Sequence, residues 1–264
     1  MPEVARGAAT LAAAGVDTPR LDAELLLAEA LGVDRTRLFL DAPAVHPANL
    51  AHFEQLIERR VAREPVAYIL GRRDFRRLTL AVDRRVLIPR PETELLVEVG
   101  LTLPSGVRVA DVGTGSGAVA LALKDERPDL DVVGIDLNKG AVAVARDNAS
   151  RLGLAASFVV GDLLSGLDLR FDAVLANLPY VAEGASLPPE ISKWEPASAL
   201  FAGADGLDVI RRLMQMLDGV SVVALEIGFD QADAVVSLVS GAGFGSVERL
   251  RDLAGHERVV VGRR

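Results

Sequence analysis

The chain has 264 residues, of which half are hydrophobic and none is cysteine. This length allows one large core and a smaller domain, and the lack of cysteine excludes disulfides, thiolate metal ligands and a cysteine nucleophile. The three histidines are scattered without the spacing of metal ligands, so we expect no metal site. No uninterrupted apolar stretch approaches the ~20 residues that a helix needs to span a bilayer, and the first residues do not resemble a signal peptide. We therefore expect a cytoplasmic protein.

The formal net charge is −8, and most of the negative excess lies after residue 104. Enzymes that act on nucleic acids usually present a basic face. The C-terminal part of this chain is instead acidic, which argues against direct nucleic-acid binding. We also expect a monomer without a membrane partner.

The first 71 residues have the pattern of a helical domain. Thr18 followed by Pro19 predicts an N-cap and the first residue of a leucine-rich helix, which ends at Gly32. Apolar residues at helical spacing after Pro47 predict a further helix.

Residues 72–90 differ in character, with seven arginines and only two acidic residues, Asp74 and Asp83. Their alternating apolar positions predict a β-hairpin that turns near Asp83. Two interpretations of the positive excess stay open. The arginine stems of a solvated hairpin can cover apolar surface, or the hairpin can be a docking surface for an acidic protein partner.

From residue 107 onward, predicted strands and helices alternate. The strands cover 107–112, 131–136, 157–160, 172–176, 220–226, 246–250 and 259–261, and the helices cover 117–127, 139–152, 207–217 and 231–239. Such alternation predicts an α/β fold with a mainly parallel, doubly wound sheet, closed by an antiparallel hairpin. The domain boundaries that we expect are 1–71 for the helical domain, 72–90 for a hairpin linker and 91–264 for the sheet domain.

A glycine-rich loop follows the first of these strands and opens a helix, with the sequence Gly113-Thr114-Gly115-Ser116-Gly117. Glycines permit positive φ and let the backbone approach a ligand closely. Asp136 ends the second strand, where an acid can accept hydrogen bonds from ribose hydroxyls. Asp162 and Leu163 follow the third strand and are candidates to contact the edge and face of an adenine. Because the pattern also fits a dinucleotide fingerprint, the loop alone does not separate NAD(P) from S-adenosylmethionine.

The sequence Asn177-Leu178-Pro179-Tyr180 follows a buried strand, at the edge where α/β sheets hold ligands. The Asn177 side-chain oxygen and the Leu178 main-chain oxygen can together accept both N–H bonds of a primary amide, which orients its nitrogen for in-line attack on a methyl group. Pro179 restricts Leu178 to extended geometry, and Tyr180 can stack on the planar group. Together with the glycine loop, the pattern predicts methyl transfer onto an amide or an exocyclic amine.

Further motifs along nearly the whole chain belong together. They lie at 65–71, 87–94, 195–196, 203–207 and 225–228, and the 87–94 segment is the most specific. With the two loops above, they resemble the motifs of the bacterial release-factor glutamine methyltransferases, the HemK/PrmC family. The resemblance implies a class I S-adenosylmethionine-dependent methyltransferase fold, Rossmann-like with a seven-stranded sheet, preceded by a small helical domain. It also implies methylation of the glutamine amide in the Gly-Gly-Gln loop of class 1 peptide chain release factors.

The resemblance also implies roles for individual residues. Asn177 to Tyr180 would hold the target glutamine, while Gly113 to Gly117 and Asp136 would bind S-adenosylmethionine, with S-adenosylhomocysteine as the product. We count Asn177 in both sites. The N-terminal helices would help to dock the release factor.

Leu178 stands where this family usually has a proline. The main-chain carbonyl survives the change, but the locked φ angle is lost. Asn-Leu-Pro-Tyr is more typical of ribosomal RNA adenine dimethyltransferases, although those enzymes place the cofactor loop near their N-terminus. Methylation of a ribosomal-protein glutamine or of a DNA adenine also stays open. A nicotinamide-dependent oxidoreductase or a non-catalytic nucleotide-binding scaffold is the alternative from another class.

Overall fold

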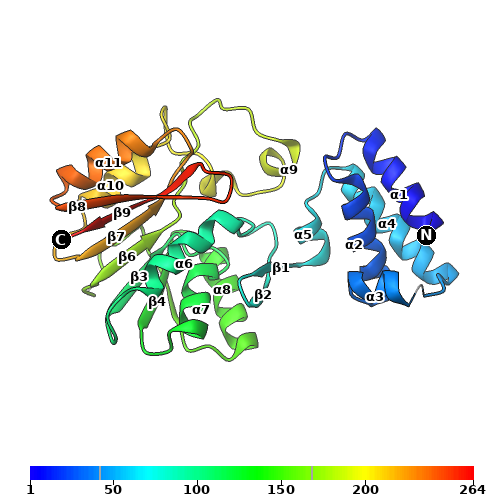
Figure 1. Ribbon diagram of the computed structural model, residues 1–264, viewed down its shortest axis with the longest axis horizontal. Coiled ribbons are helices and arrows are strands. Elements are labelled where there is room, and N and C mark those ends of the chain that lie inside the picture. The colour runs from blue at the N-terminus through cyan, green and yellow to red at the C-terminus, as the bar shows by residue number, and fades with distance from the viewer. Residues whose placement is uncertain (42, 168) are drawn as a thin grey trace. The chain divides into compact units, whose positions relative to one another are not determined.

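The computed structural model describes residues 1–41, 43–167 and 169–264, which divide into two compact units (Figure 1). The helical unit comprises Met1–Arg72 together with Leu187–Trp194. The sheet unit comprises Arg73–Ser186 and Glu195–Arg264. Within the described residues, no helix combines the length and the apolar character needed to cross a membrane.

The helical unit is built around one apolar core. Its helices are α1 (Pro2–Ala13), α2 (Pro19–Leu31), α3 (Arg35–Leu40), α4 (Pro47–Val61), α5 (Val66–Leu70) and the short α9 (Pro189–Ser192). The core includes Leu11, Leu26 and Phe53, which come from three different helices. Thr18 precedes α2 as predicted, but its hydroxyl donates to Asp22 at 2.8 Å and does not cap the helix. The sequence pattern missed α3 because its six residues are too few to show a helical period.

The segment Leu187–Trp194 joins the helical unit through ion pairs. Two nitrogens of Arg63 donate to the two carboxylate oxygens of Glu190 at 2.7 and 2.8 Å. Arg60 donates to the same carboxylate at 2.9 Å and to Asp22 at 2.8 Å. The guanidinium groups therefore hold a segment that follows the Asn-Leu-Pro-Tyr loop in the sequence.

The predicted hairpin exists, but it turns earlier than expected. Strands β1 (Arg72–Phe75) and β2 (Leu78–Ala81) pair across a turn at Arg76 and Arg77, so the prediction of a turn near Asp83 is wrong. Arg76 adopts a φ of +51°, a left-handed conformation that non-glycine residues rarely adopt. Ion pairs of its guanidinium with Glu98 and Glu126 hold it there, which no local turn signal reveals.

Ion pairs also neutralise much of the positive charge of residues 72–90. Besides Arg76, the paired arginines and their partners are Arg72 with Glu29, Arg77 with Asp125, Arg85 with Asp83, and Arg90 with Glu195. These carboxylates all belong to this chain, so the pairs give no support to a docking surface for an acidic partner.

The sheet unit contains a seven-stranded sheet in the order β5-β4-β3-β6-β7-β9-β8. Its strands are β3 (Arg108–Val112), β4 (Asp131–Asp136), β5 (Ser157–Val160), β6 (Ala173–Ala176), β7 (Val222–Glu226), β8 (Ser246–Arg251) and β9 (Glu257–Arg263). The first five pair in parallel, and β9 pairs antiparallel with both β7 and β8. The predicted fold class and the closing antiparallel hairpin are therefore confirmed.

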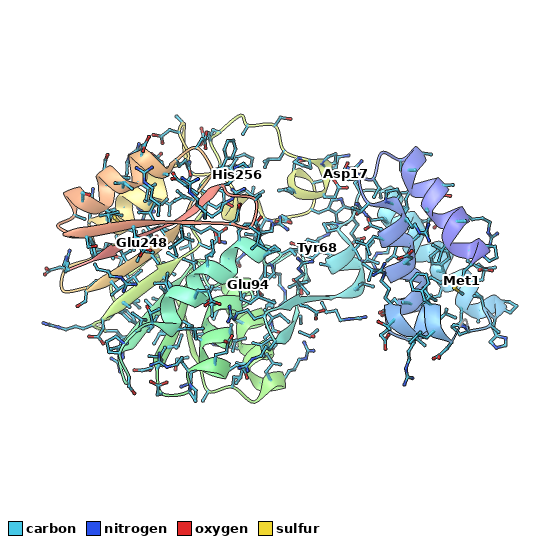
Figure 2. The ribbon with its side chains drawn as sticks, viewed as in Figure 1. Met1, Asp17, Tyr68, Glu94, Glu248 and His256 are labelled. Atoms are coloured by element: carbon cyan, nitrogen blue, oxygen red, sulfur yellow. The ribbon has the colours of Figure 1, made fainter. Side chains whose placement is uncertain are left out.

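Helices cover both faces of this sheet (Figure 1). One apolar cluster joins the sheet to α6 (Glu94–Leu101), α7 (Ala118–Glu126) and α8 (Lys139–Leu152). A second cluster joins the other face to α10 (Asp208–Met214) and α11 (Ala232–Gly241). The edge strand β8 exposes Arg249, Arg251 and Glu248, the last of which is labelled in Figure 2. Charged side chains protect an edge strand against pairing with another chain.

The strand order reverses direction between β3 and β6, which are neighbours in the sheet but not in the sequence. Val112 pairs with Ile135 on one side and with Ala176 on the other. The next residue of each strand, Gly113, Asp136 and Asn177, must therefore lie at the same edge. Ligands of α/β sheets bind at such a reversal point.

Candidate active site

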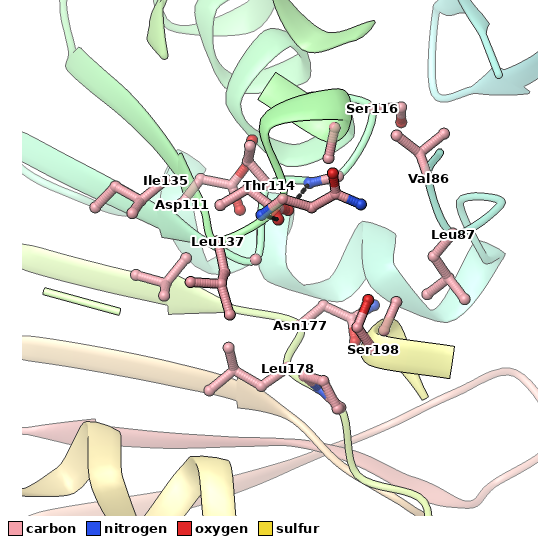
Figure 3. A pocket seen from close by; sticks show the side chains of 18 of the residues that line it. Val86, Leu87, Asp111, Thr114, Ser116, Ile135, Leu137, Asn177, Leu178 and Ser198 are labelled. Atoms are coloured by element: carbon pink, nitrogen blue, oxygen red, sulfur yellow. Dashed lines mark hydrogen bonds between the residues drawn. The ribbon is translucent and has the colours of Figure 1, made fainter. Parts of the chain in front are cut away.

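A cavity of about 410 Å³ lies at the carboxyl ends of β3, β4 and β6 (Figure 3). Most of the predicted site residues line it: Gly113, Thr114, Gly115, Ser116, Asp136, Asp162, Leu163, Asn177, Leu178 and Pro179. Gly117 does not line it but precedes α7 as its N-cap residue, with a φ of +84°. Cavities of this size commonly hold small-molecule ligands.

The glycine loop passes very close to the Asn-Leu-Pro-Tyr loop. Gly113 has a φ of +78°, and a Cβ atom at this position would lie 2.7 Å from the main-chain oxygen of Asn177. One carboxylate oxygen of Asp111, a buried residue of β3, accepts a hydrogen bond from the Thr114 hydroxyl at 2.6 Å and another from the Ala120 N–H at 3.1 Å. Burial, opposed by these hydrogen bonds, raises the pKa of Asp111 to about 6. Asp111 thus fixes the glycine loop, and the close contact with Asn177 leaves no room for a side chain at Gly113.

Asp136 is held by backbone donors on both of its carboxylate oxygens. The N–H of Gly115 donates to one oxygen at 2.9 Å, and the N–H of Asn138 donates to the other at 2.8 Å. Burial raises the pKa of Asp136, and these two bonds oppose the shift. Since a carboxylate oxygen has two lone pairs, each oxygen can accept one further hydrogen bond from a ligand hydroxyl.

Apolar side chains form part of the cavity wall. Leu137, which directly follows Asp136, is 68% exposed although it is a large hydrophobic residue. With Ile135 and Leu163 it offers an apolar surface for a flat ring. Asp162 lines the cavity as predicted, but its carboxylate pairs with Arg212 at 2.6 Å. An adenine contact by Asp162 would have to share this carboxylate with the guanidinium.

The amide of Asn177 is oriented by a neighbour that the sequence did not reveal. Its nitrogen Nδ2 donates to the hydroxyl oxygen of Thr93 at 3.1 Å. Since the two ends of a planar amide point in different directions, Oδ1 faces away from Thr93. Leu178, next in the loop (Figure 3), is only 4% exposed and belongs to a buried apolar cluster of the sheet unit.

Tyr180 does not line the same cavity as the rest of its loop. It lines a second, polar cavity of about 180 Å³ with Arg90, Glu92, Glu226 and Arg258. Its hydroxyl donates to Glu226 at 3.4 Å. Burial and the nearby Glu226 carboxylate raise the pKa of Tyr180 above its usual range. The stacking role of Tyr180 stays a prediction.

The main chain of Tyr180 is also fixed. Gln231 donates from Nε2 to the Tyr180 carbonyl at 2.9 Å and to the Asp205 carbonyl at 3.2 Å. Gly206 has a φ of +75°, and a Cβ atom there would lie 2.2 Å from the same Tyr180 oxygen. The motif at 203–207 therefore packs directly against the end of the Asn-Leu-Pro-Tyr loop.

Glu226 is the main feature of the second cavity. It is 2% exposed, and its atom Oε2 is buried with no hydrogen-bond partner among the described residues. Burial, assisted by Glu92 and opposed by the hydroxyls of Thr93 and Tyr180, raises its pKa to about 7. The sheet register places Leu225 beside Ala176, so Glu226 ends β7 next to the position where Asn177 follows β6. In the sequence, Glu226 could be recognised as a polar residue at the end of a buried strand.

Comparisons with known proteins agree with this geometry. Family models described as the PrmC N-terminal domain and the methyltransferase small domain match residues 4–71 and 91–192. The release factor glutamine methyltransferase of Rhodospirillum rubrum is 43% identical over 270 residues, covering 98% of this chain and 83% of that protein. The enzyme of the same name from Mycolicibacterium smegmatis is 43% identical over 267 residues, covering 97% and 94%.

Among solved structures, a methyltransferase from Pyrococcus furiosus has a TM-score of 0.50 at 16% identity, over 70% of this chain and 87% of that chain. At this identity the likeness concerns the fold alone. The two relatives, by contrast, match this chain over nearly its whole length at a high identity. The chain therefore belongs to the release factor glutamine methyltransferase family.

Proposed function

We propose that this chain transfers a methyl group from S-adenosylmethionine to the side-chain amide nitrogen of the glutamine in the Gly-Gly-Gln loop of class 1 release factors. The observation that carries the proposal is the placement of Asn177. Its amide is oriented by Thr93, and it lines the same cavity as the glycine loop and Asp136. The Asn177 oxygen, which can accept from a planar N–H group, thus lies beside the residues that suit a nucleoside.

The cavity suits S-adenosylmethionine in three respects. The glycine loop leaves backbone atoms accessible where a Cβ atom would clash, Asp136 retains acceptor capacity for ribose hydroxyls, and Leu137 and Leu163 offer apolar contact for a base. When bound, this cofactor supplies a methyl group that is electrophilic because it is attached to a sulfonium. The protein then has to bind and orient the second substrate.

Orientation of the target amide is the task of the Asn-Leu-Pro-Tyr loop. An amide nitrogen is a poor nucleophile, because its lone pair is delocalised into the carbonyl. The Asn177 Oδ1 atom and the Leu178 carbonyl would accept its two N–H bonds and turn the lone pair toward the methyl group. Such positioning lowers the barrier by several kcal/mol in well-oriented reactions, on the order of 7–11 at best.

We further propose that residues 1–71 dock the release factor, that 72–90 link them to the methyltransferase domain at 91–264, and that the enzyme acts as a cytoplasmic monomer. The relatives in Rhodospirillum rubrum and Mycolicibacterium smegmatis carry release factors in their names, and they match the helical part as well as the sheet part.

Mass spectrometry tests the proposal directly. Purified release factor is incubated with the enzyme and S-adenosylmethionine, digested and sequenced. We expect one added methyl group on the glutamine of the Gly-Gly-Gln loop, and none when that glutamine is replaced by asparagine. Methylation of ribosomal RNA in a parallel reaction, with an unmodified release factor, would refute the proposed substrate.

A further inference from the structure

A chain of buried polar groups leads from Asn177 to the second cavity. Asn177 Nδ2 donates to Thr93 at 3.1 Å, and the Thr93 hydroxyl is near enough to the Glu226 carboxyl to lower its pKa. Thr93 and Glu226 are 4% and 2% exposed. Glu226 also accepts from the Tyr180 hydroxyl at 3.4 Å. The carboxyl group is therefore connected to both polar side chains of the catalytic loop without lining the larger cavity itself.

While Glu226 is ionised, the hydroxyl of Thr93 can bond its two neighbours in only one way. It has one proton to donate and lone pairs to accept with. An ionised carboxylate is an acceptor only, so it draws the Thr93 proton toward Glu226. The oxygen of Thr93 is then left to accept from Asn177 Nδ2, as observed. A protonated Glu226 would no longer impose this direction, because it can donate as well.

We propose that Glu226 is a positioning residue, which acts through the hydroxyl of Thr93 to keep the Asn177 amide turned with its oxygen toward the target amide. The inference deepens the proposed function, because it assigns what sets the geometry of the same acceptor. Glu226 itself touches neither substrate nor cofactor in this scheme.

The charges around Glu226 make its ionisation sensitive to pH. Glu92 from the turn before α6 disfavours the ionised form, while Arg258 from β9, Thr93 and Tyr180 favour it, and Arg90 lines the same cavity. Burial dominates and brings the pKa to about 7. The orientation of Asn177 should therefore become fixed as pH rises through neutrality.

The first test does not need a substrate. Heteronuclear NMR of the uniformly nitrogen-labelled protein reports the side-chain NH₂ of Asn177, which is assigned by its loss in Asn177→Ala. We expect its signals to shift with a midpoint near pH 7, following Glu226. The shift should disappear in Glu226→Gln, which cannot ionise, and in Thr93→Val, which lacks the hydroxyl. Thr93→Ser should keep it.

Thr102→Val is the matched control, because Thr102 lies at the end of α6 and its hydroxyl donates to the Val99 carbonyl. This variant should titrate like the parent protein. Persistence of the Asn177 shift in either Glu226→Gln or Thr93→Val would overturn the proposal. Since Glu226→Gln preserves the shape of the side chain, a folding defect of Thr93→Val alone leaves the test decisive.

The second test measures methylation of release factor at about pH 8. We expect kcat of Thr93→Val to fall at least ~10-fold, because the amide acceptor is no longer aligned. KM and the affinity for S-adenosylhomocysteine should stay within about twofold, and Thr93→Ser should recover most of the rate. If Thr93 had only a structural role, Thr93→Val and Thr93→Ser would instead have lower melting temperatures, and the kcat of the folded fraction would be unchanged.

The two tests separate this proposal from the proposed function. If the parent enzyme did not methylate release factor, the NMR titration would still decide whether Glu226 orients Asn177. If release factor is methylated but the Asn177 shift persists in Glu226→Gln, the positioning role is wrong while the proposed function stands.

Discussion

The carboxylate of Asp136 accepts a hydrogen bond from the N–H of Gly115 at 2.9 Å, so the end of β4 is tied to the middle of the glycine loop. Asp136 would therefore act twice on a bound nucleoside. It would present acceptor oxygens to the ribose, and it would fix the glycine loop beside the remainder of the ligand. Removing the side chain and removing only its charge should have different effects.

We predict that Asp136→Ala weakens binding of S-adenosylhomocysteine by roughly 1–3 kcal/mol, because ribose hydrogen bonds and the Gly115 anchor are both lost. Asp136→Asn should lose less, since its amide oxygen can still accept one of these bonds. Asp131→Ala, at the exposed beginning of the same strand, is the control and should bind normally. Calorimetry measures all three affinities. Equal affinity of Asp136→Ala and the parent protein would remove Asp136 from the cofactor site.

Asn177→Ala removes the proposed side-chain acceptor while the glycine loop keeps its close contact with the main chain of residue 177. We expect methylation of release factor to fall at least ~10²-fold in kcat, because a misplacement of about 1 Å can have this effect. Affinity for S-adenosylhomocysteine should change little. Near-normal turnover, measured by methyl incorporation from labelled cofactor, would exclude the two-acceptor arrangement.

The pKa of Asp111, raised to about 6 from an ordinary 3.8, makes stability depend on pH. The folded state binds the proton more tightly than the unfolded state, so stability falls as pH rises from about 4 to about 6 and then levels off. Asp111→Asn does not ionise, and its oxygen can accept both bonds because both go to one atom, Oδ2. We predict that this variant is more stable than the parent at neutral pH, by roughly 1–3 kcal/mol.

The advantage of Asp111→Asn should vanish near about pH 4, where the parent carboxyl is protonated in the fold. Asp83→Asn is the control, because the pKa of Asp83 is shifted in the opposite direction. The Arg85 guanidinium lowers the pKa of the half-exposed Asp83, so its small contribution to stability is present at neutral pH and lost as pH falls. Thermal unfolding of both variants without ligand, across this pH range, is the measurement. An Asp111→Asn advantage independent of pH would contradict the assignment.

The strands of the sheet unit were predictable because their apolar runs have clear borders. The predicted strands at 131–136 and 157–160 and the helix at 139–152 agree with the structure residue by residue. The reversal of strand order beside β3 then places Gly113, Asp136 and Asn177 at one edge. Short-range patterns were enough for these features because parallel sheets bury strands on both faces.

Other features depend on contacts between distant segments. The turn at Arg76 is held by carboxylates 22 and 50 residues away, and no glycine marks it. Thr93 reaches Asn177 across 84 residues, and Glu190 joins the helical unit from 127 residues beyond Arg63. Sequence periodicity carries no information on such partners, which explains why Thr93 was not a predicted site residue.

Glu190 should be needed to hold its segment on the helical unit. Glu190→Gln keeps the size of the side chain but removes the charge that the guanidinium groups of Arg60 and Arg63 share. We predict a loss of roughly 1–3 kcal/mol, since hydrogen bonds to charged, largely buried groups are involved. Limited proteolysis should cut faster within 181–195. Glu183→Gln, an exposed change in the same stretch, should leave both the melting temperature and the cleavage rate as they are.

The departure from the usual family motif allows a last test at Leu178. If its carbonyl is the functional group, Leu178→Pro should keep methylation of release factor within about tenfold, because proline retains the carbonyl and fixes φ near −65°. The leucine side chain is 4% exposed in an apolar cluster, so this variant should lose stability, by roughly 1–3 kcal/mol. Leu178→Gly should lose more methylation activity and more stability than Leu178→Pro, since glycine adds backbone freedom and leaves a cavity.

Leu217→Ala separates the effect on stability from the effect on methylation, because Leu217 is buried in the same cluster outside the Asn-Leu-Pro-Tyr loop. It should lower the melting temperature like the Leu178 variants and leave kcat of the folded protein unchanged. If Leu178→Pro abolished methylation while Leu217→Ala, at equal stability, preserved it, the side chain or the N–H of Leu178 would have to contact the substrate. Assaying the same variants on ribosomal RNA then shows whether that substrate is a nucleic acid, which would contradict the proposed function.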